Sequence, residues 1–431
     1  MPAQTENDKA WQRYLDAQAI RFDQPFYAVN AVQLKELGGR EPRLMAKFDT
    51  PEQLAAPLRN AGYTLLPVKN GEYVLIAGNA FALVPPCESI GVFNPLLPFP
   101  LYTAGRGSSE AQYIDQAYNI GLLHHFLGMD AADGLFQTIR GREYTSRFEF
   151  RFSGRSITVE SVQIEVDAGY EGLQDIVLLE AKIGLPKHLN IRQVYYPFRH
   201  FSQLVPQKRV RNIFLAYDIP STQYSLYEYI FPDVLDPTSA QVRQCANYRL
   251  QAPRRLNIHS LIDVRFQTTG TTAPQADDLN KIFELVTLVG SGVNRAPEVA
   301  DYFVFDQRQS SYYREAAEYL GLIRHSRHEG YSLTESGMLL LTEPSQEKPL
   351  VLAKLIINSW IFVELIRRAS KSRLFTFEDI DAVIGSLIHG GVPRYSGTTI
   401  SRRGKTIKAW IAWLAQEIGC FAVEGDRVYL R

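Results

Sequence analysis

The chain has 431 residues, 45% of them hydrophobic and 12% aromatic, which suffices for roughly two to four domains with packed cores. Its 46 basic and 46 acidic residues cancel, which gives no support to a protein that coats nucleic acid through net charge but is compatible with local basic patches. Three widely spaced cysteines predict a reducing compartment without structural zinc. The N-terminus is polar and no stretch reaches about 18 apolar residues, so we expect a cytoplasmic protein without membrane spans.

Residues 1–135 are expected to form an N-terminal α+β module. One helix is expected to have Thr50 as its N-cap, Pro51 at its first position and Gly62 as its C-cap. Asn70 and Gly71 form the dipeptide that favours a two-residue hairpin turn, and apolar runs flank it. The expected elements are a polar helix over 6–20, a strand over 26–34, a helix over 50–61, strands over 63–68 and 72–77, and a helix near 110–127.

Residues 136–266 are expected to form a second domain that is built on a sheet. A polar stretch over 267–277, rich in Thr, Gly and Pro, has the composition of a linker and follows this domain. The expected elements are a meander of strands over 148–152, 161–167 and 176–181, a helix over 191–201, and strands over 211–217 and 223–231.

The most informative segment is 161–182, SVQIEVDAGYEGLQDIVLLEAK, which has the pattern of a β-hairpin. Because side chains alternate along a strand, Glu165 and Asp167 share one face of the first strand. Glu180 and Lys182 share one face of the second strand, at the end of an apolar run. Carboxylates and an ammonium group beside a hydrophobic sheet are destabilising unless they are paired, and a divalent metal ion would be such a partner.

Asp167, then Glu180-x-Lys182, and then a helix that carries Arg192 and Gln193 resemble the core of the PD-(D/E)xK nucleases, the fold of most type II restriction endonucleases. The Pro-Asp dipeptide of the strict motif is absent here. The resemblance implies a multidomain α+β or α/β chain with a mixed sheet flanked by helices. It also implies that Gln193 or Arg192 supports the catalytic site.

The resemblance further implies a Mg²⁺ site held by the carboxylates of Asp167 and Glu180, with the carbonyl of Ala181 as a third ligand. Lys182 would orient the attacking water or stabilise the charge that develops on the phosphate. Glu165 lies on the same strand face as Asp167 and is the alternative ligand. The alternative to a catalytic site is an ordinary surface hairpin with a salt-bridged polar face.

Residues 278–345 and 350–431 are expected to form two winged-helix domains in tandem. In the first, Arg308, Gln309 and Arg314 lie on the third helix, the one that a winged helix places in the major groove. Its expected elements are helices over 278–288, 296–303 and 305–320, a strand that begins at 321, and a polar-tipped wing over 327–334.

The second domain carries a basic cluster near the start of its long third helix, with no acidic residue from 394 to 410. Arg394, Arg402, Arg403 and Lys405 are therefore candidates for contacts with phosphates or guanine edges. The alternative is a solvated charged face. The expected elements are helices over 352–368, 376–387 and 396–418 and a strand pair over 420–423 and 427–430.

Together these features predict a Mg²⁺-dependent, sequence-specific endonuclease that cleaves double-stranded DNA, as a type II restriction enzyme does. A single nuclease core cuts one strand, so we expect a homodimer on a palindromic site. The resemblance implies a prokaryotic cytoplasmic protein and a separate protective methyltransferase in the same restriction-modification system. Two alternatives stay open: a winged-helix regulator with an inactive nuclease-like domain, and a repair nuclease that reads DNA structure or modified bases.

Overall fold

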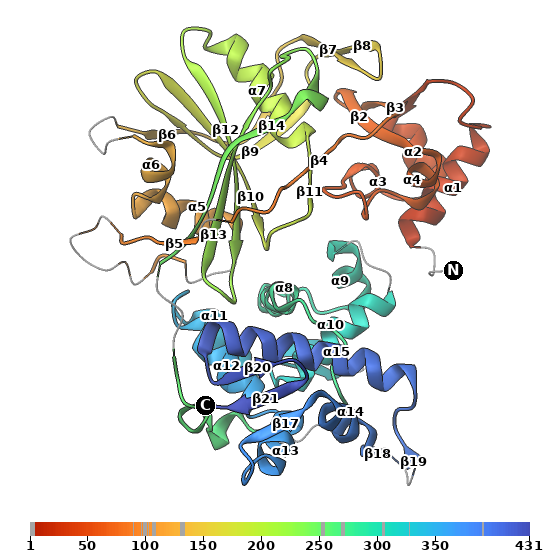
Figure 1. Ribbon diagram of the computed structural model, residues 1–431. Coiled ribbons are helices and arrows are strands. Elements are labelled where there is room, and N and C mark those ends of the chain that lie inside the picture. Colours follow the sequence, from red (N-terminus) through yellow and green to blue (C-terminus); the bar gives the residue numbers. More distant parts are fainter. Residues whose placement is uncertain are drawn as a thin grey trace.

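The structure of the protein is a computed structural model that describes residues 5–88, 90–95, 97, 101, 103–105, 109–129, 134–250, 255–268, 272–303, 307–326, 328–389 and 392–431. Within these ranges, the side chains of 307–309, 388–389 and 392–393 are not described. The chain forms three bodies that follow one another along the sequence (Figure 1). We call residues 5–83 the N-terminal body, 90–250 the sheet body and 279–430 the C-terminal body.

The N-terminal body is a small α+β unit with its own hydrophobic core around Trp11, Tyr14 and Phe48. Its sheet has the strand order β1-β3-β2, and the expected Asn70-Gly71 hairpin joins β2 to β3. Its elements are α1 (Glu6–Ala17), β1 (Phe26–Asn30), α2 (Ala31–Gly38), α3 (Pro42–Ala46), α4 (Ala56–Ala61), β2 (Tyr63–Lys69), β3 (Glu72–Ala77) and β4 (Phe81–Leu83).

Two elements of this body, one helix and one strand, have other bounds in the structure than the sequence predicts. The helix expected over 50–61 starts only at Ala56, because the side chain of Gln53 accepts hydrogen bonds from the backbone N–H groups of Asp49 and Thr50 and holds a turn there. The strand expected over 26–34 ends at Asn30, whose side chain accepts from the N–H of Val32 and caps α2.

The sheet body contains a seven-stranded mixed sheet with the order β5-β14-β13-β12-β10-β9-β6. Strands β9 and β10 are antiparallel, whereas β10 and β12 are parallel, so α7 is the crossover between them. Its elements are β5 (Ile90–Val92), α5 (Glu110–Asn119), α6 (Leu122–Leu127), β6 (Phe136–Tyr144), β7 (Phe148–Phe152), β8 (Arg155–Val159), β9 (Gln163–Glu171), β10 (Asp175–Ile183), β11 (His188–Asn190), α7 (Arg192–Leu204), β12 (Arg209–Asp218), β13 (Gln223–Ile230) and β14 (Gln241–Arg249).

Three expectations for this region were wrong in detail. Strand β7 pairs with β8 outside the large sheet, and β6 takes the place beside β9 that the expected meander gave to β7. The helix expected near 110–127 is broken at Gly121, which adopts φ 82°. Strand β5 pairs with β14, and α5 packs against the sheet, so an N-terminal module that ends at residue 135 does not match the structure.

The C-terminal body packs two helical units into one hydrophobic cluster with the sheet body. The helix expected over 352–368 is two helices, because Asn358 donates to the carbonyls of Leu261 and Lys354 and interrupts it. The elements of the first unit are α8 (Leu279–Gly290), α9 (Ala296–Phe303), α10 (Gln307–Tyr319), β15 (Ile323–Ser326), β16 (Gly330–Leu333) and α11 (Glu335–Thr342).

The second unit closes with a three-stranded sheet of order β17-β21-β20. The apolar residues Ile407, Trp410, Ile411 and Leu414 are fully buried, as their helical spacing predicts. Its elements are α12 (Lys348–Ile357), α13 (Trp360–Arg368), β17 (Leu374–Thr376), α14 (Phe377–Gly385), β18 (Ile388–His389), β19 (Val392–Pro393), α15 (Thr398–Trp413), a π-helical turn (Leu414–Ile418), β20 (Phe421–Glu424) and β21 (Arg427–Leu430).

In the part of the chain that the structure describes, no single helix has both the length and the apolar composition to cross a membrane. Helices α12 and α13 meet these criteria only when taken together, as a pair bent by 66°.

Candidate active site

The β9–β10 hairpin brings Asp167 against the end of β10. The two strands pair from Ile176 opposite Glu171 to Leu179 opposite Ala168. Two residues beyond Leu179, the backbone N–H of Ala181 donates to Oδ2 of Asp167 at 2.8 Å. A side-chain oxygen therefore takes the place of the next backbone acceptor, which fixes the carboxylate of Asp167 beside the segment that carries Glu180 and Lys182.

Glu180 and Lys182 form a tight pair at this position. Nζ of Lys182 lies 2.6 Å from Oε1 of Glu180 and 3.1 Å from the carbonyl oxygen of Ala181. Glu180 is only 6% exposed, and this burial raises the pKa of its carboxyl group to about 8 although Lys182 acts in the opposite direction. Burial thus favours the protonated form of this carboxyl group, whereas the ammonium group of Lys182 favours the ionised form.

Lys182 stays charged in this environment. Burial by itself would lower the pKa of its amine, but the carboxylates of Glu180 and Glu110 outweigh burial and raise the pKa above its ordinary value. An amine that holds its proton at neutral pH can orient a water molecule or stabilise negative charge, but it cannot act as a general base.

Helix α7 adds Gln193 to the site. Nε2 of Gln193 donates to the same Oε1 of Glu180 at 2.5 Å. The other amide atom of Gln193, Oε1, is buried and has no hydrogen-bond partner among the described residues. Between the two residues that the sequence suggested for this role, Gln193 is the one that contacts Glu180. Its unpaired oxygen leaves an acceptor beside the site.

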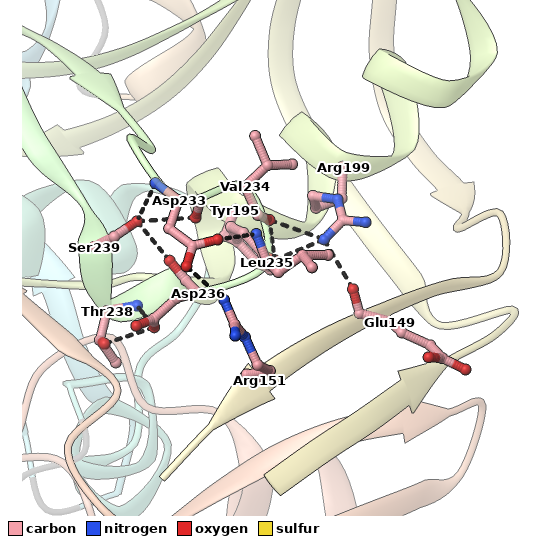
Figure 2. A network of polar contacts seen from close by, with 10 residues as sticks. All are labelled: Glu149, Arg151, Tyr195, Arg199, Asp233, Val234, Leu235, Asp236, Thr238 and Ser239. Atoms are coloured by element: carbon pink, nitrogen blue, oxygen red, sulfur yellow. Dashed lines mark hydrogen bonds and ion pairs between the residues drawn. The ribbon is translucent and has the colours of Figure 1, made fainter. Parts of the chain in front are cut away.

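The far end of α7 is fixed by a network of polar contacts (Figure 2). Nη1 of the buried Arg199 donates to the carbonyls of Glu149 and Val234, both at 2.9 Å, and to the hydroxyl of Tyr195 at 2.8 Å. These bonds tie α7 to β7 and to the loop that follows β13. Because α7 is held at several points, the position of Gln193 on Glu180 is determined by the fold and not by one contact.

Two further acids act on the site, and no pattern in the sequence indicates them. Oε1 of Glu110, the first residue of α5, is 3.9 Å from Nζ of Lys182. Burial raises the pKa of Glu110, and the charges of Asp167 and Asp49 add to this effect. Asp49 comes from the N-terminal body. Neither acid has a motif around it, since each reaches Lys182 only through the packing of distant segments.

Glu165 is placed differently from Asp167. Its side chain is 63% exposed and lies 3.6 Å from Arg142, within an exposed ion pair. It lines a small recess together with Glu180 and Gln193. Burial raises the pKa of Asp167, as expected for a carboxyl group inside the site. Of the two acids, the structure therefore brings Asp167, and not Glu165, against the end of β10.

The oxygen donors at this site have the chemistry that Mg²⁺ prefers, namely carboxylates and a backbone carbonyl. They belong to Asp167, Glu180 and Ala181, with Glu110 nearby. Within the described ranges, no three His, Cys, Asp or Glu side chains are grouped as a ready metal site. Lys182 instead contacts Glu180 and the Ala181 carbonyl. The donor set fits a hard cation, provided that the ammonium group moves away from these oxygens.

The first candidate DNA-binding helix is described only in part. The side chains of Arg308 and Gln309 lie outside the described part of the structure. Arg314 is 22% exposed, and its guanidinium lies 3.5 Å from Glu315 and 3.8 Å from Glu318. Arg314 is thus an intrahelical partner of acids in this arrangement.

The basic cluster of the second unit divides into exposed and buried members. Arg402 and Lys405 are exposed on α15. Arg403 is only 8% exposed, stacks 4.4 Å from the ring centroid of Tyr395, and lies 3.5 Å from Glu315 of the first unit. Arg394 also lies over Tyr395, at 5.8 Å. Arg403 therefore joins the two units and is not presented to DNA, because Tyr395 and Glu315 enclose it.

Comparisons with protein families match three separate parts of the chain, each to a domain of unknown function. The matches are DUF6996 over residues 8–75, DUF6997 over 97–249 and DUF7226 over 281–419. They follow the three bodies, and the expected boundary at residue 135 lies inside the second match. No curated protein and no solved structure matches the chain.

Proposed function

We propose that this protein is a Mg²⁺-dependent endonuclease of the PD-(D/E)xK type that cleaves double-stranded DNA. The observation that carries the proposal is the convergence of Asp167 with the Glu180–Lys182 pair across the β9–β10 hairpin. Gln193 joins Glu180 from the helix that crosses over to the parallel strand β12. An ordinary surface hairpin would leave these groups hydrated, whereas here Glu180 is buried.

The residues have distinct roles in this proposal. Asp167, Glu180 and the carbonyl of Ala181 would hold Mg²⁺, and Glu110 is a further carboxylate within reach of the same cation. Bound Mg²⁺ supplies a water of lowered pKa and a Lewis acid at the scissile phosphate. Lys182 keeps its proton, so it would orient the attacking water and stabilise charge on the phosphate. Gln193 is a positioning residue, because it holds the carboxylate of Glu180.

The C-terminal body would bind the DNA through two winged-helix domains. In its second unit, the helices α12 to α15 are followed by the strand pair β20–β21, which β17 joins in one sheet, and in the first unit the helices α8 to α10 are followed by the β15–β16 pair. Arg402 and Lys405 are the exposed cations of α15 and the best candidates for phosphate contacts. Cleavage of both strands of a palindrome would require a homodimer. Protection of the host DNA would require a separate methyltransferase.

The proposal is tested by incubating unmodified plasmid DNA with the protein and Mg²⁺, with and without EDTA, and sequencing the fragment ends. We expect discrete, EDTA-sensitive fragments that share one short sequence. Lys182→Ala and Asp167→Asn should abolish cleavage and leave DNA binding largely intact. Glu165→Gln should still cleave, because its side chain is exposed and outside the buried set.

Other outcomes would replace the proposal with one of its alternatives. Cutting confined to junctions, flaps or modified bases would indicate a repair nuclease. Specific binding without cleavage of any unmodified or modified DNA would leave a winged-helix regulator. Cleavage that survives in Lys182→Ala would show that the active site is elsewhere.

A further inference from the structure

Strand β9 contains a β-bulge at the residue that it brings to the candidate site. Between two neighbouring paired positions, β6 advances by two residues and β9 by three; the pairs are Ile139 with Gly169 and Gly141 with Val166. Asp167 and Ala168 therefore lie opposite a single residue of β6, Arg140. An extra residue of this kind bends the strand and changes the direction of a side chain.

The bulge changes which side of the sheet the residues of β9 face. Val166 packs in a cluster with Phe201 of α7, whereas Ala168 belongs to the cluster that contains the buried residues of α5. In a regular strand, residues two positions apart face the same side. Asp167 lies between these two residues, so the position of its carboxylate against the N–H of Ala181 depends on the bulge.

Arg140 holds the bulge from the neighbouring strand. Its Nε donates to the backbone carbonyl of Asp167 at 3.3 Å. With the side-chain amide of Gln137 turned so that its oxygen faces Arg140, that oxygen accepts from the same Nε at 2.9 Å. Nη2 of Arg140 lies 2.5 Å from Oδ1 of Asp115 on α5, the helix that begins with Glu110. One guanidinium group thus joins the backbone of Asp167 to the helix that supplies another acid near Lys182.

The backbone of β6 is irregular on both sides of Arg140. Gly141, the next residue, adopts φ 93°, a conformation that residues with a side chain rarely adopt. On the other side, the register of β6 shifts between Gln137 and Ile139. The direction of the Arg140 side chain is therefore set by this local backbone geometry and not by the regular alternation of a strand.

We propose that Arg140 is a positioning residue of the candidate site, which fixes the bulge of β9 and thereby holds the carboxylate of Asp167 where it can bind a divalent cation. Arg140 binds the backbone carbonyl of Asp167, which leaves the carboxylate to Ala181 and to the cation. The cation rests on the proposed function, but the position of Asp167 can be measured without metal or DNA.

A second arginine of the same strand provides the matched control. Arg142 lies opposite Glu165 in the register, 3.6 Å from its carboxylate. Both side chains of this pair are more exposed than those of Arg140 and Asp115, at 66% and 63% against 42% and 45%. Arg140→Gln and Arg142→Gln remove the same charge from β6, but only the first removes a contact with Asp167.

The two variants are compared with the wild type by hydrogen exchange resolved to single residues and by binding of Mn²⁺, a probe of the Mg²⁺ site. Exchange of the Ala181 N–H reports on Asp167, because that N–H donates to its carboxylate. In Arg140→Gln we expect faster exchange at Ala181 and Mn²⁺ binding that is weaker by about 10-fold to 100-fold, the range for residues that orient metal ligands. Arg142→Gln should match the wild type in both measurements.

The direction of the change in Mn²⁺ affinity separates positioning from charge. Loss of a positive charge near the site would by itself strengthen the binding of a cation. Weaker binding in Arg140→Gln therefore indicates a displaced ligand. Asp115→Asn removes the acid that anchors Arg140 and should also speed exchange at Ala181. Since this ion pair is partly exposed, its loss should leave the fold intact, so Asp115→Asn decides the question if Arg140→Gln does not fold.

Unchanged exchange at Ala181 in Arg140→Gln and Asp115→Asn would overturn the assignment, and so would an equal change in Arg142→Gln. Unchanged or tighter Mn²⁺ binding in Arg140→Gln would overturn the role of Arg140 in the site. If the wild-type protein binds no Mn²⁺, the proposed function fails, while exchange at Ala181 still decides whether Arg140 positions Asp167.

Discussion

Glu180→Gln removes a buried carboxylate while keeping the shape of the side chain, and its effect on stability is calculable. Burial raises the pKa of Glu180 from an ordinary value of 4.5 to about 8. Between these values the folded chain holds a proton that the unfolded chain has released. Stability therefore falls as the pH rises through this window, and the loss is complete only above the folded pKa.

The size of the effect follows from the linkage relation. Each pH unit inside the window changes the free energy of unfolding by about 1.4 kcal/mol per proton. Between pH 5.5 and 7.5 the wild type should thus lose about 2–3 kcal/mol relative to Glu180→Gln, which carries no such proton. The variant should be more stable than the wild type at the upper pH, and it should not cleave DNA.

The assay is chemical unfolding in EDTA at several pH values, followed by the same series with Mg²⁺. Because Mg²⁺ binds the ionised carboxylate, it should reduce the pH dependence of the wild type and leave that of Glu180→Gln unchanged. Glu171→Gln is the matched control, since its carboxylate is on the same strand as Asp167 but is 40% exposed. Parallel pH profiles for wild type and Glu180→Gln would refute a buried, proton-binding Glu180.

Three further outcomes are expected. Arg211→Met should destabilise the protein by about 3–5 kcal/mol in urea unfolding, because it leaves Glu228 buried without the two bonds of 2.7 and 2.9 Å that it now accepts. Arg402→Ala with Lys405→Ala should weaken duplex binding and lower the slope of log affinity against log salt by about 2. Arg403→Ala should leave that slope unchanged in the same titration, and instead lower the melting temperature, since its guanidinium is buried between two units.

The centre of the site could be predicted because its signals are local. An apolar run that ends in Glu180-x-Lys182 specifies which strand face the two side chains share, and the preceding alternating strand places Asp167 nearby. The Asn70-Gly71 hairpin and the amphipathic helix with Trp410 follow from equally short patterns, and both are present in the structure. Such patterns act within one or two elements, where the spacing of residues along the chain determines which side chains lie on the same face.

Contacts between distant segments could not be read in this way. Glu110 has no motif around it, and it comes to lie 3.9 Å from Lys182 only because α5 packs against the end of β10. The charge of Asp49 acts on Lys182 from the N-terminal body, and no pattern in the sequence indicates this either. The burial of Arg403 was equally hidden, since an arginine on a basic helix looks the same whether it faces solvent or a second unit.

The sequence by itself determined the hairpin, its acids and lysine, and the order of most helices and strands, because hydrogen bonding and side-chain alternation act over a few residues. Only the tertiary structure decided which strand lies beside β9, that Glu110 lies beside Lys182, and that Arg40 and Asp301 pair between the N-terminal and C-terminal bodies. These features depend on how hydrophobic faces that are far apart in the chain bury one another. Burial of this kind is not specific for a partner, so neither segment has a sequence pattern that identifies the other.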